Sequence, residues 1–352
     1  MITCPYCLKP LKTKLTQQDN RTVYTCKDGC GNSIHRDYVE QPNIPRHTIG
    51  LVGFSGHGKT VCITSLFYLL KQLENEWAAP YILDPLDSNT RTIMYKKVPE
   101  FGKGILPTST PSNFPKPALL HFAEIPSFGS RFLSFFDVAG AVYEDPARVL
   151  DQGRFVAAAD VVIFVLNIKD FGSHWQDEMR ALLAVYRDAV YNQLHINLQQ
   201  RQHLIVVLSK ADQIFDRLLN FERRLNGDDD VSFHDLSSFL ERGSYKAWVG
   251  NDFSSIFQDL SLESKNIRVS LELSGCRGFI LEAEQSFRSV EYITVSATGQ
   301  APNEQNEVPG FDHEHPKRVL DVFMWVLLKT QPQSFFRRLL KTTWSGDKKR
   351  IR

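Results

Sequence analysis

Residues 53–60, GFSGHGKT, constrain what this 352-residue chain can fold into more than any other segment. They follow an apolar, strand-like stretch at 48–53 and lead into a helical pattern of apolar residues through Leu66, Leu69 and Leu70. At such a strand-to-helix junction, the glycines of a GxxxxGK[ST] loop let successive backbone N–H groups point at a polyphosphate, beside the positive end of the helix. The segment therefore predicts a phosphate-binding loop.

The predicted nucleotide-binding residues of this loop are Gly53, Ser55, Gly56, His57, Gly58, Lys59 and Thr60. Lys59 would bridge the terminal phosphates, and the Thr60 hydroxyl would bind Mg²⁺. His57 is unusual inside such a loop. We expect its backbone amide to contact phosphate while its ring faces solvent or a partner.

A second motif follows the predicted strand at 131–137, RFLSFFD, which ends in DVAG at 137–140. In a DxxG sequence at a strand end, the carboxylate of Asp137 can hold Mg²⁺ through water, and the amide of Gly140 can contact a γ-phosphate. This motif precedes another apolar strand, at 161–167. DVAG thus follows the phosphate loop and precedes the next strand, which is the order of motifs that a nucleotide-binding site requires.

Two further motifs address the base of the nucleotide. The apolar stretch at 203–208 ends in Ser209, Lys210 and Asp212, within SKAD, and the stretch at 292–295 ends in SATG at 296–299. The Asp212 carboxylate can accept both N–H donors on a guanine edge, where adenine offers a different pattern, and the Lys210 stem would lie over the base. The backbone at Ser296 and Ala297 can approach the guanine oxygen.

These four motifs, each at the carboxyl end of an apolar strand, resemble those of the Ras-like P-loop GTPases (TRAFAC class) over about residues 48–330. GFSGHGKT resembles their phosphate loop, DVAG their DxxG, SKAD their NKxD or TKxD, and SAT their SAK. The resemblance implies GTP or GDP with Mg²⁺ as ligands, GTP hydrolysis as the reaction, and a molecular switch as the role. Together with its N-terminal segment, the chain resembles bacterial double-GTPase-type proteins of conflict systems.

Two positions depart from the family pattern. Ser209 stands where Asn or Thr is usual, but its hydroxyl can still hydrogen-bond to the phosphate loop. Ala141 follows DxxG, where many members keep a Gln that orients the attacking water. We therefore expect slow or partner-dependent hydrolysis. The alternative is a nucleotide-locked or inactive scaffold that binds protein, nucleic acid or membrane.

The threonine that such proteins offer to Mg²⁺ and the γ-phosphate should lie between Lys59 and Asp137. The stretch GILPTSTPSN supplies Thr108 and Thr110, and we prefer Thr110 because Pro111 fixes the turn after it. The catalytic group stays unidentified, with Thr110 and Gly140 as candidates.

Four of the six cysteines lie within the first 30 residues, as CPYC and CKDGC: Cys4, Cys7, Cys26 and Cys30. Two such knuckles can meet around one tetrahedral Zn²⁺, which predicts a structural zinc ribbon. The second knuckle has three intervening residues, so His35 is the alternative to Cys30 as the fourth ligand. Cys62 and Cys276 are interpreted as ordinary buried thiols.

The expected architecture is α/β: a P-loop NTPase with a mostly parallel six-stranded sheet, helices on both faces and a small N-terminal zinc ribbon. The predicted strands are 48–53, 118–124, 131–137, 161–167, 203–208 and 291–295, and the predicted helices are 59–70, 175–194 and 317–329. The family pattern implies that the second strand runs antiparallel at the edge. The predicted domains are a ribbon at 1–40, a GTPase domain at 46–332 and a basic tail at 333–352, with a partly helical insertion at about 213–290 as a partner surface.

The net charge of +1 combines two unlike parts. Residues 335–352 hold seven basic residues and one acid, a net +6, so the remainder sums to −5. Aromatic and leucine side chains alternate with these basic residues, a pattern that favours binding to an anionic membrane, nucleic acid or an acidic partner. No stretch reads as a membrane span or signal peptide, so we expect a cytoplasmic protein that binds guanine nucleotide and a protein effector, with oligomerisation as a further expectation.

Overall fold

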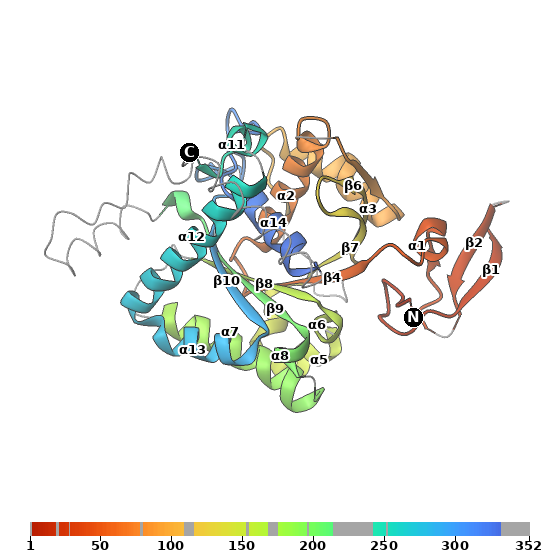
Figure 1. The fold of residues 1–352 in the computed structure, drawn as a ribbon, viewed down its shortest axis with the longest axis horizontal. Coiled ribbons are helices and arrows are strands. Elements are labelled where there is room, and N and C mark those ends of the chain that lie inside the picture. The colour runs from red at the N-terminus through yellow and green to blue at the C-terminus, as the bar shows by residue number, and fades with distance from the viewer. Residues whose placement is uncertain are drawn as a thin grey trace, which may run out of the picture.

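The computed structural model describes residues 2–18, 21–27, 29–77, 80–108, 116–152, 155–167, 175–195, 197–213, 242–250 and 253–331. Among these residues, seven strands form one sheet in the order β10-β9-β8-β4-β7-β6-β5 (Figure 1). The strands are β4 (Arg46–Val52), β5 (Ile82–Pro85), β6 (Ala118–Ile125), β7 (Gly129–Asp137), β8 (Val161–Asn167), β9 (His203–Ser209) and β10 (Ser289–Thr294). Neighbours from β10 to β7 pair in parallel, whereas β6 pairs antiparallel with both β7 and β5.

This sheet confirms the predicted mostly parallel α/β architecture, with one strand more than the six expected. The additional strand, β5, has the sequence ILDP and only four residues. Asp and Pro are poor strand formers, so the pattern did not identify it. Because β5 pairs with the outer side of β6, the antiparallel β6 is not the edge strand that the sequence predicted.

The core is divided between the two faces of the sheet, because successive side chains of a strand point to opposite sides. On β8, Ile163 and Val165 belong to one buried cluster. Phe164 and Leu166 belong to the cluster on the other face. Burial on both faces explains the continuous apolar run VVIFVL in this strand.

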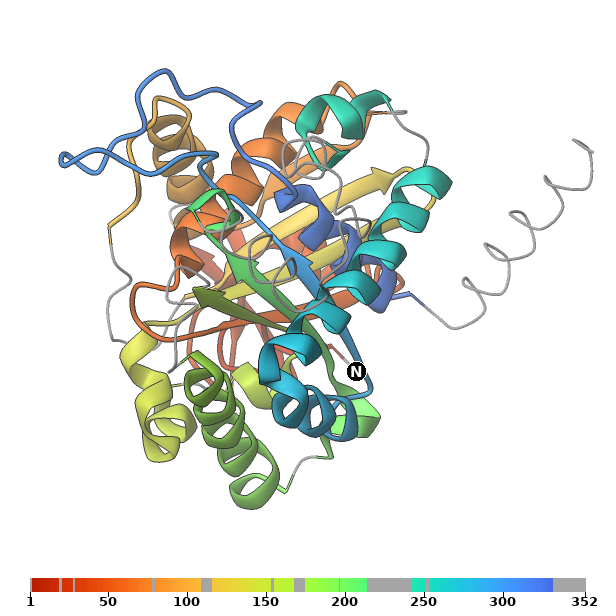
Figure 2. The same ribbon diagram turned by 90° about the vertical axis from the view of Figure 1, so that its left-hand side faces the viewer.

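Helices cover both faces (Figure 2). The first face carries α2 (Lys59–Leu73), α4 (Val98–Phe101), α11 (Tyr245–Gly250) and α14 (Val319–Lys329), with α3 (Ser88–Thr92) and the π-helical turn η1 (Ile93–Lys97) leading into α4. The second face carries α5 (Pro146–Gln152), α6 (Phe155–Ala158), α7 (Trp175–Arg187), its π-helical extension η4 (Asp188–Gln193), α8 (Leu198–Arg201) and α13 (Arg277–Ser286). The short turns are η2 (Gly140–Glu144), η5 (Ala211–Gln213) and η6 (Glu272–Cys276). None of the described helices is long and apolar enough to cross a bilayer.

Helix α12 (Phe253–Leu271) lies along the edge strand β10. Its Ile256 belongs to the first core cluster and its Ile267 to the second, so the helix spans both layers. The Ser264 hydroxyl accepts a hydrogen bond from the backbone N–H of Tyr292, 3.0 Å away, and donates to the Glu291 carboxylate. The helix thereby covers a strand edge that would otherwise be open to pairing.

Part of the predicted insertion and the whole predicted tail lie outside the described residues. Residues 214–241 of the predicted insertion and residues 332–352, which include the basic residues of the tail, are not among the described residues. The part of the insertion region that the structure describes is helical, in α11, α12 and α13.

The N-terminal residues form a small sheet of β1 (Thr13–Gln18), β2 (Arg21–Cys26) and β3 (Ser33–Ile34), followed by α1 (Arg36–Glu40). In Figure 1 the β1–β2 hairpin projects away from the large sheet. Tyr38 on α1 packs against Phe132 on β7 with ring centroids 5.2 Å apart, and the Arg46 guanidinium lies over both rings. The Tyr6 hydroxyl also donates to Asp87, 2.9 Å away. These contacts attach the small sheet to the large one.

A buried ion cluster joins α12 to the start of α14. Arg318 is fully buried and lies 2.9 Å from carboxylate oxygens of both Asp259 and Asp321. Glu263, 5% exposed, is part of the same cluster. Burial raises the pKa of Glu263 to about 7, although Arg318 opposes this shift. Two guanidinium groups, those of Arg318 and of Arg242 (3.2 Å from Asp259), therefore face three acids, and near neutral pH burial still favours a protonated Glu263.

Replacing Glu263 by Gln tests this protonation. Because the folded state holds the proton more tightly than the unfolded state, stability falls as the pH rises from about 4.5 through about 7. We expect E263Q to be more stable than wild type at about pH 8, by on the order of 2 kcal/mol in the free energy of unfolding, with the gain shrinking toward about pH 5. Denaturant unfolding across this range measures it, with the exposed Glu304→Gln as control. A difference that does not change with pH would contradict the assignment.

Candidate functional site

The phosphate loop lies where β4 ends and α2 begins, as predicted. The Lys59 side chain is 6% exposed and folds back, so that its ammonium group donates to the carbonyl oxygens of Gly53 (2.7 Å) and Phe54 (3.0 Å). Burial lowers the pKa of Lys59 to about 8, although the nearby Asp137 opposes this. A buried ammonium group at the start of a helix favours an added anion.

A cavity of about 520 Å³ opens at this edge of the sheet, a size that suits a small ligand. The structure brings ten predicted site residues to its walls: Ser55, Gly56, Gly58, Lys59, Thr60, Gly140, Ser209, Lys210, Asp212 and Ala297. Four more lie behind the walls and hydrogen-bond to residues on them: Gly53 to Lys59, His57 to Ser209, Asp137 to Thr60, and Ser296 to Asp212. Thr110, the preferred magnesium and γ-phosphate ligand, lies outside the described residues, whereas Thr108 lines the cavity.

Thr60 and Asp137 meet although they are far apart in the sequence. The Thr60 hydroxyl donates to a carboxylate oxygen of Asp137 over 2.7 Å. A hydroxyl and a carboxylate beside a phosphate site are the hard oxygen ligands that Mg²⁺ prefers. This pair fits the predicted magnesium position.

Gly140 approaches the phosphate loop closely after the end of β7. A Cβ atom at this position would lie 2.1 Å from the backbone nitrogen of Ser55, so a larger residue would push the two segments apart. The next residue, Ala141, also lies on the cavity wall. Its methyl side chain has no polar atom with which to orient a water molecule.

The part of the cavity that the sequence predicts to hold the base is built from β9 and the turn after β10. The Ser209 hydroxyl donates to the carbonyl of His57 in the phosphate loop, 2.8 Å away, so the expected bond is present despite the change from Asn or Thr. One carboxylate oxygen of Asp212 accepts from the Ser296 hydroxyl. Its other oxygen, Oδ2, is buried and has no hydrogen-bond partner among the described residues. A buried carboxylate oxygen without a protein donor is free to accept a hydrogen bond from a ligand in the cavity.

The expectation for the His57 ring was wrong. The residue is 7% exposed, and the ring turns inward, with Nδ1 3.1 Å from the Val165 carbonyl oxygen on β8. Its Nε2 lies 3.9 Å from Glu178 on α7. The periodicity of the sequence does not say which way a loop side chain points. The ring links the phosphate loop to the neighbouring strand.

Sequence reasoning missed part of the cavity wall. The missed part includes residues of two loops, the segment that precedes 109 and the connection after β10: Leu106, Pro107, Pro302 and Asn306. None of them belongs to a nucleotide-binding motif. The one available signal was the long stretch GQAPNEQNEVPG, because irregular connections of this length are often functional.

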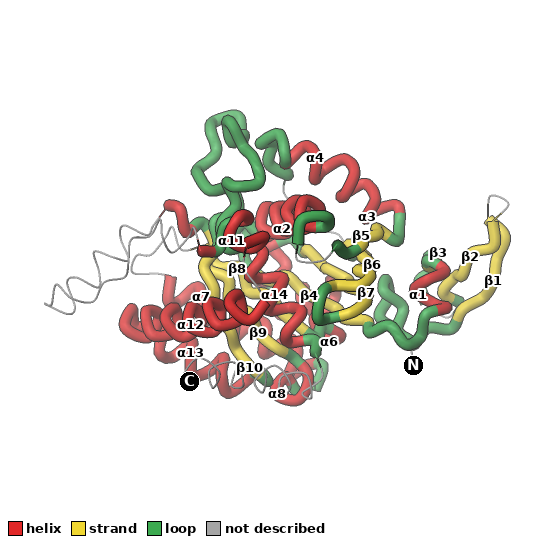
Figure 3. Tube along the Cα trace, turned by 45° about the horizontal axis from the view of Figure 1, so that its top comes forward, coloured by secondary structure: helices red, strands yellow, loops and turns green. Residues whose placement is uncertain are grey.

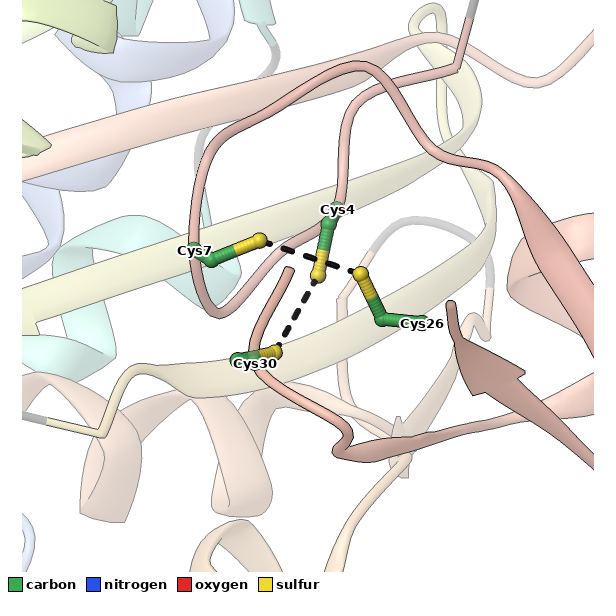
Figure 4. Close-up of side chains that lie close together, drawn as sticks. All are labelled: Cys4, Cys7, Cys26 and Cys30. Carbon is green, nitrogen blue, oxygen red and sulfur yellow. Dashed lines mark hydrogen bonds between the residues drawn. The ribbon is translucent and has the colours of Figure 1, made fainter. Parts of the chain in front are cut away.

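The four N-terminal cysteines come together as predicted (Figure 4). Their sulfur atoms all lie within 4.8 Å of one another, with Cys4–Cys30 and Cys7–Cys26 separations of 3.8 Å. A tetrahedral ion with Zn–S bonds of about 2.3 Å would place its sulfurs about 3.8 Å apart. The group therefore fits one zinc ion. His35, the alternative to Cys30, instead accepts a hydrogen bond from the backbone N–H of Asp37 at the start of α1.

The two remaining cysteines behave differently. Cys62 and Cys276 are 4% and 2% exposed, and burial raises the pKa of each to about 12. Cys62 also contributes to the wall of the nucleotide cavity. Both are buried thiols, as the sequence predicted.

The sequence matches the family description Double-GTPase 2 over residues 47–249, which is more than half of the chain. A comparison with curated proteins gave no match. The match begins in β4 and includes the phosphate loop, DVAG and SKAD.

Two crystal structures of Toc33 from Arabidopsis thaliana are similar in fold to the chain. A dimerization-deficient mutant gives a TM-score of 0.34 at 12% identity, covering 84% of this chain and 88% of that chain. Toc33 in complex with GDP and Mg²⁺ gives a TM-score of 0.36 at 13% identity, with the same coverage. At these TM-scores the family match and the site geometry, not Toc33, carry the functional assignment.

A cysteine substitution tests the zinc site. We expect wild type to contain one zinc ion per chain and Cys30→Ser to lose most of it, because three thiolates leave the tetrahedron incomplete. Elemental analysis of the purified proteins measures this. Cys276→Ser is the matched control, with the same change outside the cluster, and should retain its zinc. Equal zinc content in the two variants would contradict the site.

Proposed function

Because the chain belongs to the Double-GTPase 2 family, we propose that it binds GTP and GDP with Mg²⁺ and hydrolyses GTP slowly or with the help of a partner. Its bound nucleotide would set the conformation of the two loops at the γ-phosphate end of the cavity, which is the behaviour of a molecular switch. The family match and the geometry of the cavity support this proposal.

The observation that carries the guanine assignment is the unsatisfied Oδ2 of Asp212. A guanine base presents two adjacent N–H donors, and Asp212 already has its other oxygen held by Ser296. The backbone N–H of Gly299 donates in turn to the Ser296 hydroxyl, 3.0 Å away. The carboxylate is thus fixed in orientation before a ligand arrives. Adenine has no matching pair of donors, so the same site would reject it.

The phosphate end is assigned to residues of three segments. The backbone amides of the loop from Ser55 to Lys59 and the Lys59 ammonium would hold the phosphates, and Thr60 with Asp137 would hold the magnesium ion. When bound, Mg²⁺ would offset negative charge on the phosphates. The amide of Gly140 would meet the γ-phosphate, and Thr108 or Thr110 would close the site from the other loop.

The expected rate of hydrolysis follows from Ala141. No side chain at this position can hold the attacking water, so a partner or a second copy would have to supply that group. The other candidate function is a nucleotide-locked scaffold, and the same residue is the observation that favours it. The two differ in whether the protein turns over GTP at all.

We further propose an organisation in which residues 1–40 form a zinc ribbon, 46–332 the GTPase domain with an insertion at about 213–290, and 333–352 a basic tail. The contact of Tyr38 with Phe132 and Arg46 supports a ribbon attached to the GTPase domain. A protein effector, an anionic surface contacted by the ribbon or tail, oligomerisation and a cytoplasmic location complete the proposal.

Asp212→Ala tests nucleotide selectivity. We expect wild type to bind GDP much more tightly than ADP in the presence of Mg²⁺, and the variant to lose about 100-fold in affinity for GDP with little change for ADP. Isothermal titration with both nucleotides measures this. The exposed Asp84→Ala on β5 is the control. Equal wild-type affinities for GDP and ADP would contradict the guanine assignment.

A single-turnover assay separates the switch from the scaffold. We expect the isolated protein to hydrolyse bound GTP far more slowly than about 1 s⁻¹, because Ala141 cannot orient the attacking water. Phosphate release from preloaded protein measures the rate. Turnover at an ordinary enzyme rate would contradict the role assigned to Ala141, and bound GTP that persists unchanged even with candidate partners would favour the scaffold.

A further inference from the structure

The connection between β10 and α14 does more than join two elements. Residues 302–308 of this connection, here called the clasp, lie against the segment 104–108 that leads toward Thr110. The backbone N–H of Val308 donates to the Gly104 carbonyl (2.8 Å), and that of Leu106 donates to the Asn306 carbonyl (3.3 Å). Ile105 and Glu307 form an antiparallel bridge between these bonds. In Figure 2 the blue connection passes beside the orange-brown end of α4.

The clasp has a defined structure of its own, although Figure 3 draws the whole connection as loop. The Asn303 side chain accepts from the backbone N–H groups of Gln305 and Glu307, which fixes a tight turn. Val308 is 1% exposed. Phe311, which follows the clasp, packs on Phe101 with ring centroids 4.8 Å apart. These contacts tie the connection to the first face of the sheet.

The clasp lies on the wall of the nucleotide cavity. Pro302 and Asn306 line the same cavity as Asp212, and so do Pro107 and Thr108 on the segment that the clasp holds. The clasp begins just after the guanine-binding turn, where Thr298 and Gln300 are themselves hydrogen-bonded to each other. The chain from Thr298 through the clasp is therefore continuous. It connects the proposed base-binding end of the cavity with the 104–108 segment, which leads toward the proposed phosphate-binding end.

We propose that the clasp retains the bound nucleotide: it holds the 104–108 segment across the cavity, Asn306 contacts the nucleotide, and release requires the bonds to Gly104 and Leu106 to open. The inference rests on the proposed binding of guanine nucleotide and adds to it the element that sets the rate of exchange. Asn306 is a contact residue in this account. Gly104 is a positioning residue, because it does not lie on the cavity wall.

Gly104 offers a way to detach the clasp without touching the cavity. Its φ is +84°, and an added Cβ would lie 2.2 Å from the Val308 carbonyl oxygen and 3.3 Å from Cβ of Phe311. Alanine at this position would therefore push against the backbone of the clasp. Gly310 is the matched control: its φ is +68°, and no atom lies within 4 Å of an added Cβ. Both variants bear similar backbone strain, but only Gly104→Ala disturbs the clasp.

The experiment loads the full-length protein with GDP that carries a fluorescent label on its ribose, and follows its release into excess unlabelled GDP. We expect Gly310→Ala to release within about twofold of wild type and Gly104→Ala to release at least about tenfold faster, the effect of losing two hydrogen bonds. Asn306→Ala should release several-fold faster without a change in the preference for GDP over ADP.

A second variant locks the clasp closed, so that the inference can still be tested if Gly104→Ala misfolds. Ile105 and Glu307 are exposed partners in the bridge, so Ile105→Cys with Glu307→Cys can form a disulfide across it. The oxidised double variant should release labelled GDP at least about tenfold more slowly than its reduced form, while wild type shows no such change under the same oxidant.

Two outcomes would overturn the inference and are distinguishable. A wild-type protein that does not bind labelled GDP would contradict the proposed function and the clasp together. Binding by wild type, with equal release from Gly104→Ala and Gly310→Ala and no effect of the disulfide, would contradict the clasp alone.

Discussion

The site depends on the turn between β4 and α2, which places the positive end of a 15-residue helix and the buried ammonium group of Lys59 at one side of a cavity. The turn is held from the neighbouring strands as well. Ser209 donates to the His57 carbonyl, Lys210 donates to the Gly56 carbonyl, and the His57 ring meets the carbonyl of Val165. The N–H groups at the start of the helix and a desolvated cation strongly favour binding of an anion. The rest of the proposed site depends on this anion-binding turn.

The same bonds couple the two ends of the cavity. The residue that contacts the phosphate loop, Ser209, stands three positions before Asp212, which is oriented by Ser296. The connection that follows Ser296 then reaches the 104–108 segment through the bond from Val308 to Gly104. The proposed sites of base recognition, phosphate binding and nucleotide retention are thus joined by short stretches of hydrogen-bonded backbone. The ribbon is attached farther away, where Tyr38 meets the start of β7.

The features predicted from sequence share one property: a short motif stands at the end of an apolar strand, so strand order alone brings Lys59, Asp137 and Asp212 together. The clasp has no such property. Pro302 and Asn306 lie on the cavity wall in a loop that pairs with the segment after Gly104, and such a tertiary contact produces no periodic pattern in the sequence. The missed strand β5 has only four residues, two of which are the poor strand formers Asp84 and Pro85, and it pairs along the open edge of β6.

The central claim is that the cavity holds a guanine nucleotide. The most direct measurement is to denature freshly purified protein and identify the released small molecules by ion-exchange chromatography. The account predicts GDP or GTP as the dominant nucleotide, at close to one equivalent, because guanine supplies N–H donors to the buried Asp212 oxygen and the phosphates supply an anion to the desolvated Lys59 ammonium. Recovery of adenine nucleotides in its place would contradict it.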